Sequence, residues 1–153
     1  MNLLEQIYPP EGIFVHNPRF HPAKPEVTVT STVPEEHSYT TRPIPYVTAE
    51  NHVRILSQTS YLLAHYVIEN KLIELDVSPV EFMRAAVEFE LYYRNVAMTF
   101  HQRVKKGVSF EMILELTDFR EIRRLTDFVL FTFKNKRTVI SGEMSFAYVG
   151  TAS

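Results

Sequence analysis

One stretch of the chain, residues 50–70, restricts the possible folds more than any other. Written as a helix, ENHVRILSQTSYLLAHYVIEN is apolar on almost every side. Thr48 is suited to cap its start, Glu50 complements the dipole of the first turn, and Asn70 is suited to its end. The pattern therefore predicts a helix of about six turns. A helix that is apolar on nearly all sides must be enclosed by the rest of the chain.

One line of polar side chains follows this predicted helix at alternating spacings of three and four residues. It consists of Asn51, Arg54, Gln58, Tyr61 and His65. Two interpretations are open. The line is either a solvent-facing seam, as on most surface helices, or the polar wall of a binding site.

The first 45 residues have a different character, because they hold eight of the nine prolines. This density excludes a long helix. Residues 26–33, EVTVTSTV, alternate and are β-branched, which predicts a short strand. We expect residues 1–45 to form a strap that covers the core.

The remainder of the chain reads as strands. Pro79 marks a break with a short helical turn nearby, and about four antiparallel strands in a meander follow, within 85–100, 108–116, 125–133 and 140–148. The apolar phase flips at Asn95, which predicts a bulge or a bend. We expect turns at 105–107 (KKG) and at 134–137 (KNKR), with Asn135 at positive φ. Because each strand has one apolar face, the fold class is α+β: one domain over 1–153, with a single sheet wrapped over one helix.

Composition excludes several classes of function. The net charge of −2 gives no electrostatic basis for binding nucleic acid, and the absence of cysteine excludes disulfides, zinc–thiolate sites and thiol nucleophiles. No run approaches 18 apolar residues, so no membrane span is expected. The start of the chain lacks the features of a signal peptide, which favours a cytoplasmic location. Without metal-ligand spacing or a glycine-rich phosphate loop, we expect neither a metal nor a cofactor.

Two segments, YVTAENHVRILSQTSYLLA (46–64) and YYRNVAMTFHQRVKKG (92–107), resemble the FcoT-like long-chain fatty acyl-CoA thioesterase family. That family has a similar helix opening, an Asn-Gln pair in mid-helix and a Tyr three residues after the Gln. The matching positions here are Ser57, Gln58 and Tyr61. Two further family tyrosines, one before the helix and one near the N-terminus, correspond to Tyr39 and Tyr8. The chain departs from the pattern at Ser57 and Thr48, where the family has Asn.

The resemblance implies a hotdog fold, in which an antiparallel sheet wraps around one long central helix, and hydrolysis of fatty acyl-CoA or of acyl-carrier protein. It assigns catalysis to Gln58, Tyr61, Tyr39, Ser57 and Tyr8. Because the family lacks the usual carboxylate base, Gln58 would orient water through its amide. Backbone N–H groups at the helix start would stabilise the oxyanion. The expected substrate-binding residues are Thr48, Ala49, Asn51, Arg54 and Asn95.

Two alternatives remain open. The first is chemistry on an enoyl thioester, either hydration and dehydration or the Michael addition of glycine to an enoyl-carrier protein in isonitrile lipopeptide biosynthesis. The second is a non-catalytic acyl-binding protein. In each case the fold predicts a homodimer or a multiple of dimers, formed by joining sheets edge to edge, with Arg94 and Asn95 near a shared site.

Overall fold

The computed structural model describes residues 2–38, 40–122 and 128–149. Its elements are α1 (Leu3–Ile7), the 3₁₀ turn η1 (Pro10–Gly12), β1 (Val15–Phe20), β2 (Glu26–Ser31), α2 (Ala49–Glu69), α3 (Pro79–Val87), β3 (Leu91–Phe100), β4 (Phe110–Ile122), β5 (Phe128–Lys136) and β6 (Ile140–Tyr148). None of the helices in these ranges is long and apolar enough to cross a membrane.

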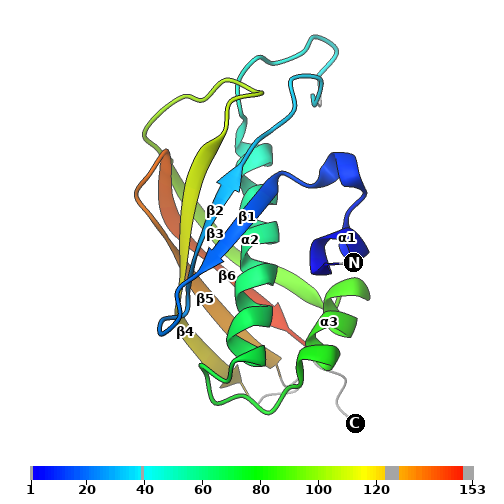
Figure 1. Cartoon of the computed structure of the whole chain (residues 1–153), viewed down its shortest axis with the longest axis vertical. Coiled ribbons are helices and arrows are strands. Elements are labelled where there is room, and N and C mark those ends of the chain that lie inside the picture. Colours follow the sequence, from blue (N-terminus) through cyan, green and yellow to red (C-terminus); the bar gives the residue numbers. More distant parts are fainter. Residues whose placement is uncertain (1, 39, 123–127, 150–153) are drawn as a thin grey trace.

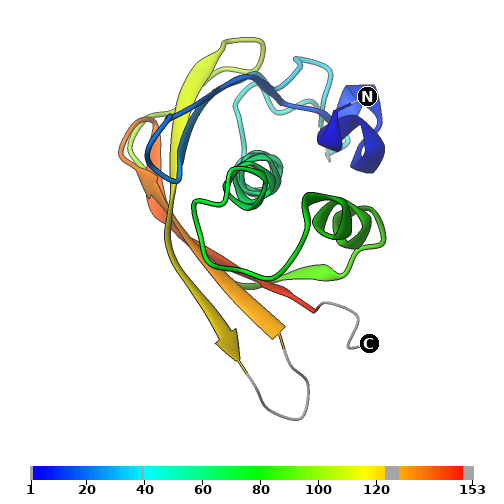
Figure 2. The same ribbon diagram turned by 60° about the horizontal axis from the view of Figure 1, so that its bottom comes forward.

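The strands form one antiparallel sheet in the order β1-β2-β4-β5-β6-β3. The sheet curves around α2, and α1 and α3 lie on the side of α2 that faces away from the sheet (Figures 1 and 2). This confirms the predicted α+β hotdog architecture, in which a curved sheet encloses one long helix.

The predicted ends of the central helix are confirmed. The Thr48 side chain accepts a hydrogen bond from the N–H of Asn51, and the Asn51 side chain accepts one from the N–H of Thr48, which together form a capping box. Glu50 lies in the first turn and Asn70 is the C-cap. These contacts fix the start of α2.

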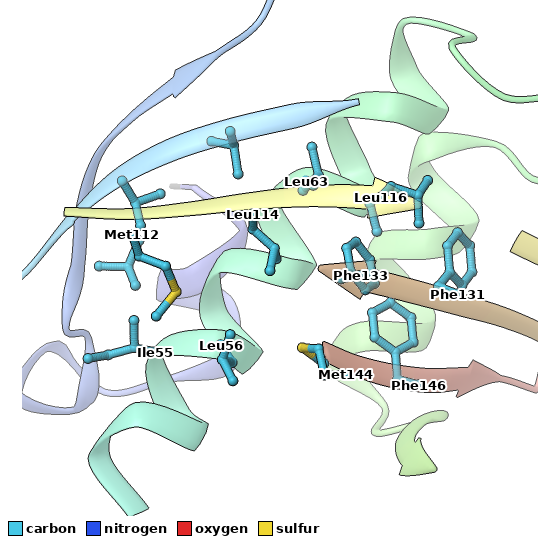
Figure 3. Packing of buried hydrophobic residues seen from close by; sticks show 14 of the residues in the cluster. Ile55, Leu56, Leu63, Met112, Leu114, Leu116, Phe131, Phe133, Met144 and Phe146 are labelled. Carbon is cyan, nitrogen blue, oxygen red and sulfur yellow. The ribbon is translucent and has the colours of Figure 1, made fainter. Parts of the chain in front are cut away.

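The core fills the space between α2 and the concave face of the sheet (Figure 3). The residues in this contact are Ile55, Leu56 and Leu63 of α2, Met112, Leu114 and Leu116 of β4, Phe131 and Phe133 of β5, and Met144 and Phe146 of β6. Stacked and tilted ring contacts join Phe131, Phe133 and Phe146 at centroid distances of 5.1–6.4 Å. Burial of so many large side chains supplies the main driving force for folding.

Besides the 3₁₀ turn η1, the N-terminal region contains a helix and a strand that the sequence did not predict. The first is α1, which is closed by a capping box between Asn2 and Glu5. The second is β1, which contains Pro18 and lies at one edge of the sheet. Proline is tolerated there because the register shifts between His16 and Arg19, which forms a bulge.

The prediction for residues 85–90 was wrong in type. This segment completes α3 and a turn, and β3 begins only at Leu91. A capping box between Ser78 and Glu81 and the Pro at the start of the helix stabilise α3. The chain leaves α3 through Phe89, which has a φ of 59°.

The prediction of a simple meander was also wrong, because β3 pairs with β6 and forms the second edge of the sheet. The predicted bulge is confirmed, since the register of β3 shifts between Tyr93 and Asn95. Farther along the same pair of strands, Gly142 faces the backbone of Ala97 so closely that a Cβ atom would overlap the Ala97 carbonyl oxygen. The close pairing of β3 and β6 therefore requires glycine at this position.

One predicted turn is confirmed and one is displaced. Residues 105–107 form a turn that ends at Gly107, with a φ of 81°. Asn135 lies instead inside β5, opposite Leu114 and Gly142, and the bend follows at 137–139. Leu125, expected in the third of the four strands, lies outside the described residues.

Candidate active site

The polar line on α2 is not a solvent-facing seam. Asn51 and Gln58 are buried, and Arg54, Tyr61 and His65 are half-buried. The side of α2 that carries Asn51, Arg54 and Gln58 is covered by the N-terminal segment. Enclosure by other parts of the chain therefore gives these polar groups protein partners in place of water.

Gln58 is hydrogen-bonded through both ends of its amide. Its Oε1 accepts from the N–H of Phe14 at 2.9 Å and from the N–H of Val15 at 3.2 Å. Its Nε2 donates to the carbonyl of Gly12 at 2.6 Å. Both acceptor positions of the oxygen are thus filled by the chain itself. In this conformation Gln58 holds the N-terminal segment against α2.

Ser57, the neighbour of Gln58, is the centre of a group of hydroxyls. Its Oγ is hydrogen-bonded to the phenol of Tyr93 on β3. Ser57 is also close enough to Tyr8 to lower the pKa of its phenol, and Tyr61 is close enough to raise the pKa of both Tyr8 and Tyr93. We call Ser57, Tyr8, Tyr61 and Tyr93 the hydroxyl cluster.

Burial determines the protonation state of this cluster. Loss of hydration raises the pKa of Tyr8 to about 12, with a further rise from Tyr61 and opposing effects of the Ser57 hydrogen bond and Arg54. Burial also raises the pKa of Tyr61 and of Tyr93. All three phenols are therefore protonated near neutral pH and act as hydrogen-bond donors, not as bases.

The start of α2 is occupied mainly by its own cap. The Asn51 Oδ1 accepts from both the N–H and the hydroxyl of Thr48, at 2.9 Å and 3.0 Å. The N–H groups of Asn51 and His52 are also bonded within the chain. An oxyanion at this end of the helix would therefore face the N–H groups of Ala49 and Glu50.

Arg54 belongs to a second set of contacts. Its guanidinium lies 5.3 Å from the centre of the Phe14 ring, and its Nη1 is 3.4 Å from Nε2 of His37. His37 in turn lies 3.5 Å from the Asn51 amide through Nδ1. Arg54 also acts on Tyr8, whose pKa it lowers. Its charge thus borders the hydroxyl cluster.

The structure brings Ser57, Tyr61 and Tyr8 together, as the resemblance predicts for a site. Asn95 lies exposed on β3 beyond the bulge, two residues after Tyr93. Tyr39 lies outside the described residues. The sequence did not identify Tyr93 as a member of the hydroxyl cluster, because the alternation of apolar and polar residues placed it on the apolar face of its strand. The change of apolar phase at Asn95 could have indicated the role of Tyr93, because a bulge redirects the side chains next to it.

The carboxylates of the described residues do not act on this cluster. Among the groups that shift the pKa values of Tyr8, Tyr61 and Tyr93, none is an Asp or Glu of the described residues. The same part of the chain contains no group of three or more His, Cys, Asp or Glu side chains that could hold a metal ion. The cluster can donate hydrogen bonds to a developing negative charge, and it has no strong base of its own.

No protein-family model and no curated protein matches the chain. Among solved structures, the chain is similar to the hypothetical protein SAV2348 from Staphylococcus aureus, which was characterised in complex with CoA. The two sequences are 14% identical and the TM-score is 0.50, and the match covers 84% of this chain and 72% of that one. A weaker likeness joins it to Cj0977, a sigma28-regulated virulence protein from Campylobacter jejuni, with 8% identity and a TM-score of 0.45 over 99% and 98% of the two chains. At these identities, the first likeness concerns the fold alone.

Proposed function

We propose that the protein is an acyl-thioester hydrolase that acts on fatty acyl-CoA or on acyl-carrier protein. The observation that carries this proposal is the hydroxyl cluster, where three protonated phenols and one serine meet beside the central helix. Groups of buried hydrogen-bond donors are suited to an oxyanion, because they stabilise charge without having to reorganise.

In the proposed reaction, the thioester carbonyl oxygen accepts hydrogen bonds from the cluster and so becomes more electrophilic. Water attacks the carbonyl carbon, and the negative charge that develops on the oxygen is held by the phenols of Tyr8 and Tyr93. The tetrahedral intermediate collapses by breaking the C–S bond. The proton lost by water reaches the departing sulfur, and the products are a carboxylic acid and a thiol.

Two observations support a substrate that is linked to CoA or to a carrier protein. The resemblance of residues 46–64 and 92–107 is to fatty acyl-CoA thioesterases. A protein with a similar fold was characterised in complex with CoA. Because CoA and carrier proteins both present the thioester on the same type of flexible arm, these supports apply to either carrier.

A second candidate is addition to an enoyl thioester, including the Michael addition of glycine. The favouring observation is the lack of a carboxylate acting on the phenols among the described residues. Hydrolysis benefits from a base that activates water, whereas the unprotonated amine of glycine is itself nucleophilic. It attacks the β-carbon, the C=C π bond opens to an enolate, and the proton that the nitrogen then loses is returned to the α-carbon. The same cluster would then stabilise an enolate. A non-catalytic acyl-binding protein is the third candidate and would show binding without turnover.

The proposed site extends to the edge of the sheet at β3. Tyr92 and Phe100 on this strand are 46% and 48% exposed, so two large side chains are accessible at this edge. We propose that two copies pair along β3, which would bring a partner next to Tyr93. Light scattering on the wild type and on Tyr92→Lys would test this, with a shift toward monomer expected in the variant.

The decisive experiment is a mass-spectrometric assay with purified protein. Saturated and 2-enoyl thioesters of several lengths, on CoA and on a carrier protein, would be offered with and without glycine. Free acid from saturated substrates would support hydrolysis. A β-adduct formed only from enoyl substrates would favour addition, and tight binding without any product would reject both enzymatic proposals.

A further inference from the structure

A cavity lies at the N-terminal end of the chain, between α1, η1, β1 and one side chain of α2. Its volume is about 630 Å³, within the ~300–1,000 Å³ typical of small-molecule sites. Apolar side chains make up much of its lining: Leu4, Tyr8, Ile13, Val15, Pro18 and Leu62. The polar residues Glu5 and His16 also border it, and both are exposed.

This cavity shares one residue with the hydroxyl cluster. Tyr8 lines the cavity, and its phenol lies close enough to Ser57 and Tyr61 for both to affect its pKa. Leu62, which lines the cavity from α2, directly follows Tyr61 in the helix. A molecule whose polar head contacts the cluster could therefore continue along Tyr8 into an apolar space.

The wall of the cavity is held in place by Gln58. The backbone groups of Gly12, Phe14 and Val15 are hydrogen-bonded to its amide, and these residues lie between Tyr8 and the bulge of β1. Leu4 is also buried in the core, which anchors the segment on the other side of Tyr8. The wall is thus a fixed part of the fold, and the cavity is formed before a ligand arrives.

We propose that this cavity is the acyl-chain subsite and that Leu62 limits the length of the chain it accepts. The ligand class is an unbranched acyl chain with its thioester head at the hydroxyl cluster. This inference rests on the proposed function, since it assumes an acyl thioester as the ligand. Burial of an apolar chain here gains affinity with each methylene, and side chains that fill the cavity remove that gain.

The test measures binding by calorimetry with non-hydrolysable thioether analogues of acyl-CoA that carry 4, 8, 12 and 16 carbons. The variant Leu62→Phe would fill the cavity, and Ile13→Phe provides an independent obstruction from the opposite wall. Leu72→Phe is the matched control, because Leu72 is also partly buried against the core but does not line the cavity. Thermal unfolding would verify that each variant is folded.

We expect Leu62→Phe to leave binding of the shortest analogue unchanged and to weaken binding of longer ones, by about fourfold for each methylene that no longer fits. Leu72→Phe should follow the wild type at every length. If both cavity variants keep the wild-type length dependence, the subsite is elsewhere while the proposed function stands. If the wild type binds no analogue and turns over no thioester, the proposed function fails and this inference fails with it.

Discussion

The hydroxyl of Ser57 on α2 is hydrogen-bonded to the phenol of Tyr93 on β3, and this bond joins the central helix to the edge of the sheet. The two residues are 36 positions apart in the sequence. Tyr93 is 37% exposed, so the same side chain reaches both the buried serine and the open edge of the sheet. Removing either hydroxyl group tests the role of the hydroxyl cluster without creating a large cavity in the core.

We predict that Tyr93→Phe and Ser57→Ala each lower kcat by about 10²-fold or more, because the first removes a donor to the oxyanion and the second removes the hydroxyl that positions this donor. The double variant should lose little more than either single one, since the two hydroxyls act together. Tyr92→Phe is the matched control, because it removes a phenol from the adjacent, exposed residue. Steady-state kinetics of all four variants would decide the matter, and equal rates for Tyr92→Phe and Tyr93→Phe would reject a role for the cluster.

A second prediction concerns Gln58. Gln58→Ala should lower the free energy of unfolding by about 3 kcal/mol or more, because it leaves two N–H groups and one carbonyl unpaired in a buried place. A protonated Glu in Gln58→Glu keeps an oxygen that can accept from Phe14 and Val15 and an O–H that can donate to Gly12, so its loss should be smaller than that of Gln58→Ala at a pH where the side chain is neutral. Urea denaturation measures these differences.

The comparison for Gln58 is Gln102→Ala, which changes the same residue type at an exposed position. It should leave stability within about 0.5 kcal/mol of the wild type. If Gln58→Ala were as stable as Gln102→Ala, the hydrogen bonds to residues 12–15 would not hold the N-terminal segment.

A third prediction concerns acid stability. His52 is 2% exposed, its Nδ1 has no hydrogen-bond partner among the described residues, and burial lowers its pKa to about 4 from 6.5. Between these values the unfolded chain binds a proton that the folded chain does not. Stability should therefore fall as the pH drops from about 6.5 to about 4, by up to roughly 3 kcal/mol.

The variant His52→Phe should remove this part of the pH dependence, because a ring without a titrating group replaces the imidazole between Phe100 and Phe110. Thermal unfolding at pH 7 and at pH 4.5 gives the comparison. His16→Phe serves as the control at an exposed site. If the stability of His52→Phe and of the wild type declines equally as the pH falls, groups other than His52 cause the decline.

A fourth prediction concerns Gly142. In Gly142→Ala, the new methyl group would overlap the Ala97 carbonyl, so β3 and β6 must separate locally. We expect a loss of about 2 kcal/mol or more and a lower kcat, because Tyr93 lies on the displaced strand. Glu143→Ala is a control on the adjacent exposed residue. Amide hydrogen exchange would follow β3, and unchanged protection would contradict the proposed overlap.

Much of the fold could be predicted because its signals are local. The capping residues Thr48 and Asn70 bound the central helix, and the change of apolar phase at Asn95 marked the bulge. An error arose where one local signal overrode another. Residues 85–90 alternate like a strand, yet the Pro start and capping box of α3 carry the helix through Val87.

The candidate site could be predicted only in part. Ser57, Tyr61 and Tyr8 were identified through the resemblance, and they are close together in the structure. Tyr93 was missed, because its inward contact depends on pairing with β6 and on the bulge, which are both nonlocal. The hydrogen bonds of Gln58 go to backbone atoms of residues 12–15. Hydrogen bonds to backbone atoms do not depend on the type of the partner residue, so the sequence alone does not reveal these partners.

The position of Tyr8 has a consequence for the order in which the protein acquires its site. The ribosome makes Tyr8 well before Ser57 and Tyr93, and β1 and β2 join the main sheet only when β4 is available. Contacts so distant in sequence form slowly, because closing long loops costs conformational entropy. The site is therefore completed only after β4 has been made, and a nascent chain that ends before Phe110 has its hydroxyls without the sheet that would hold them together.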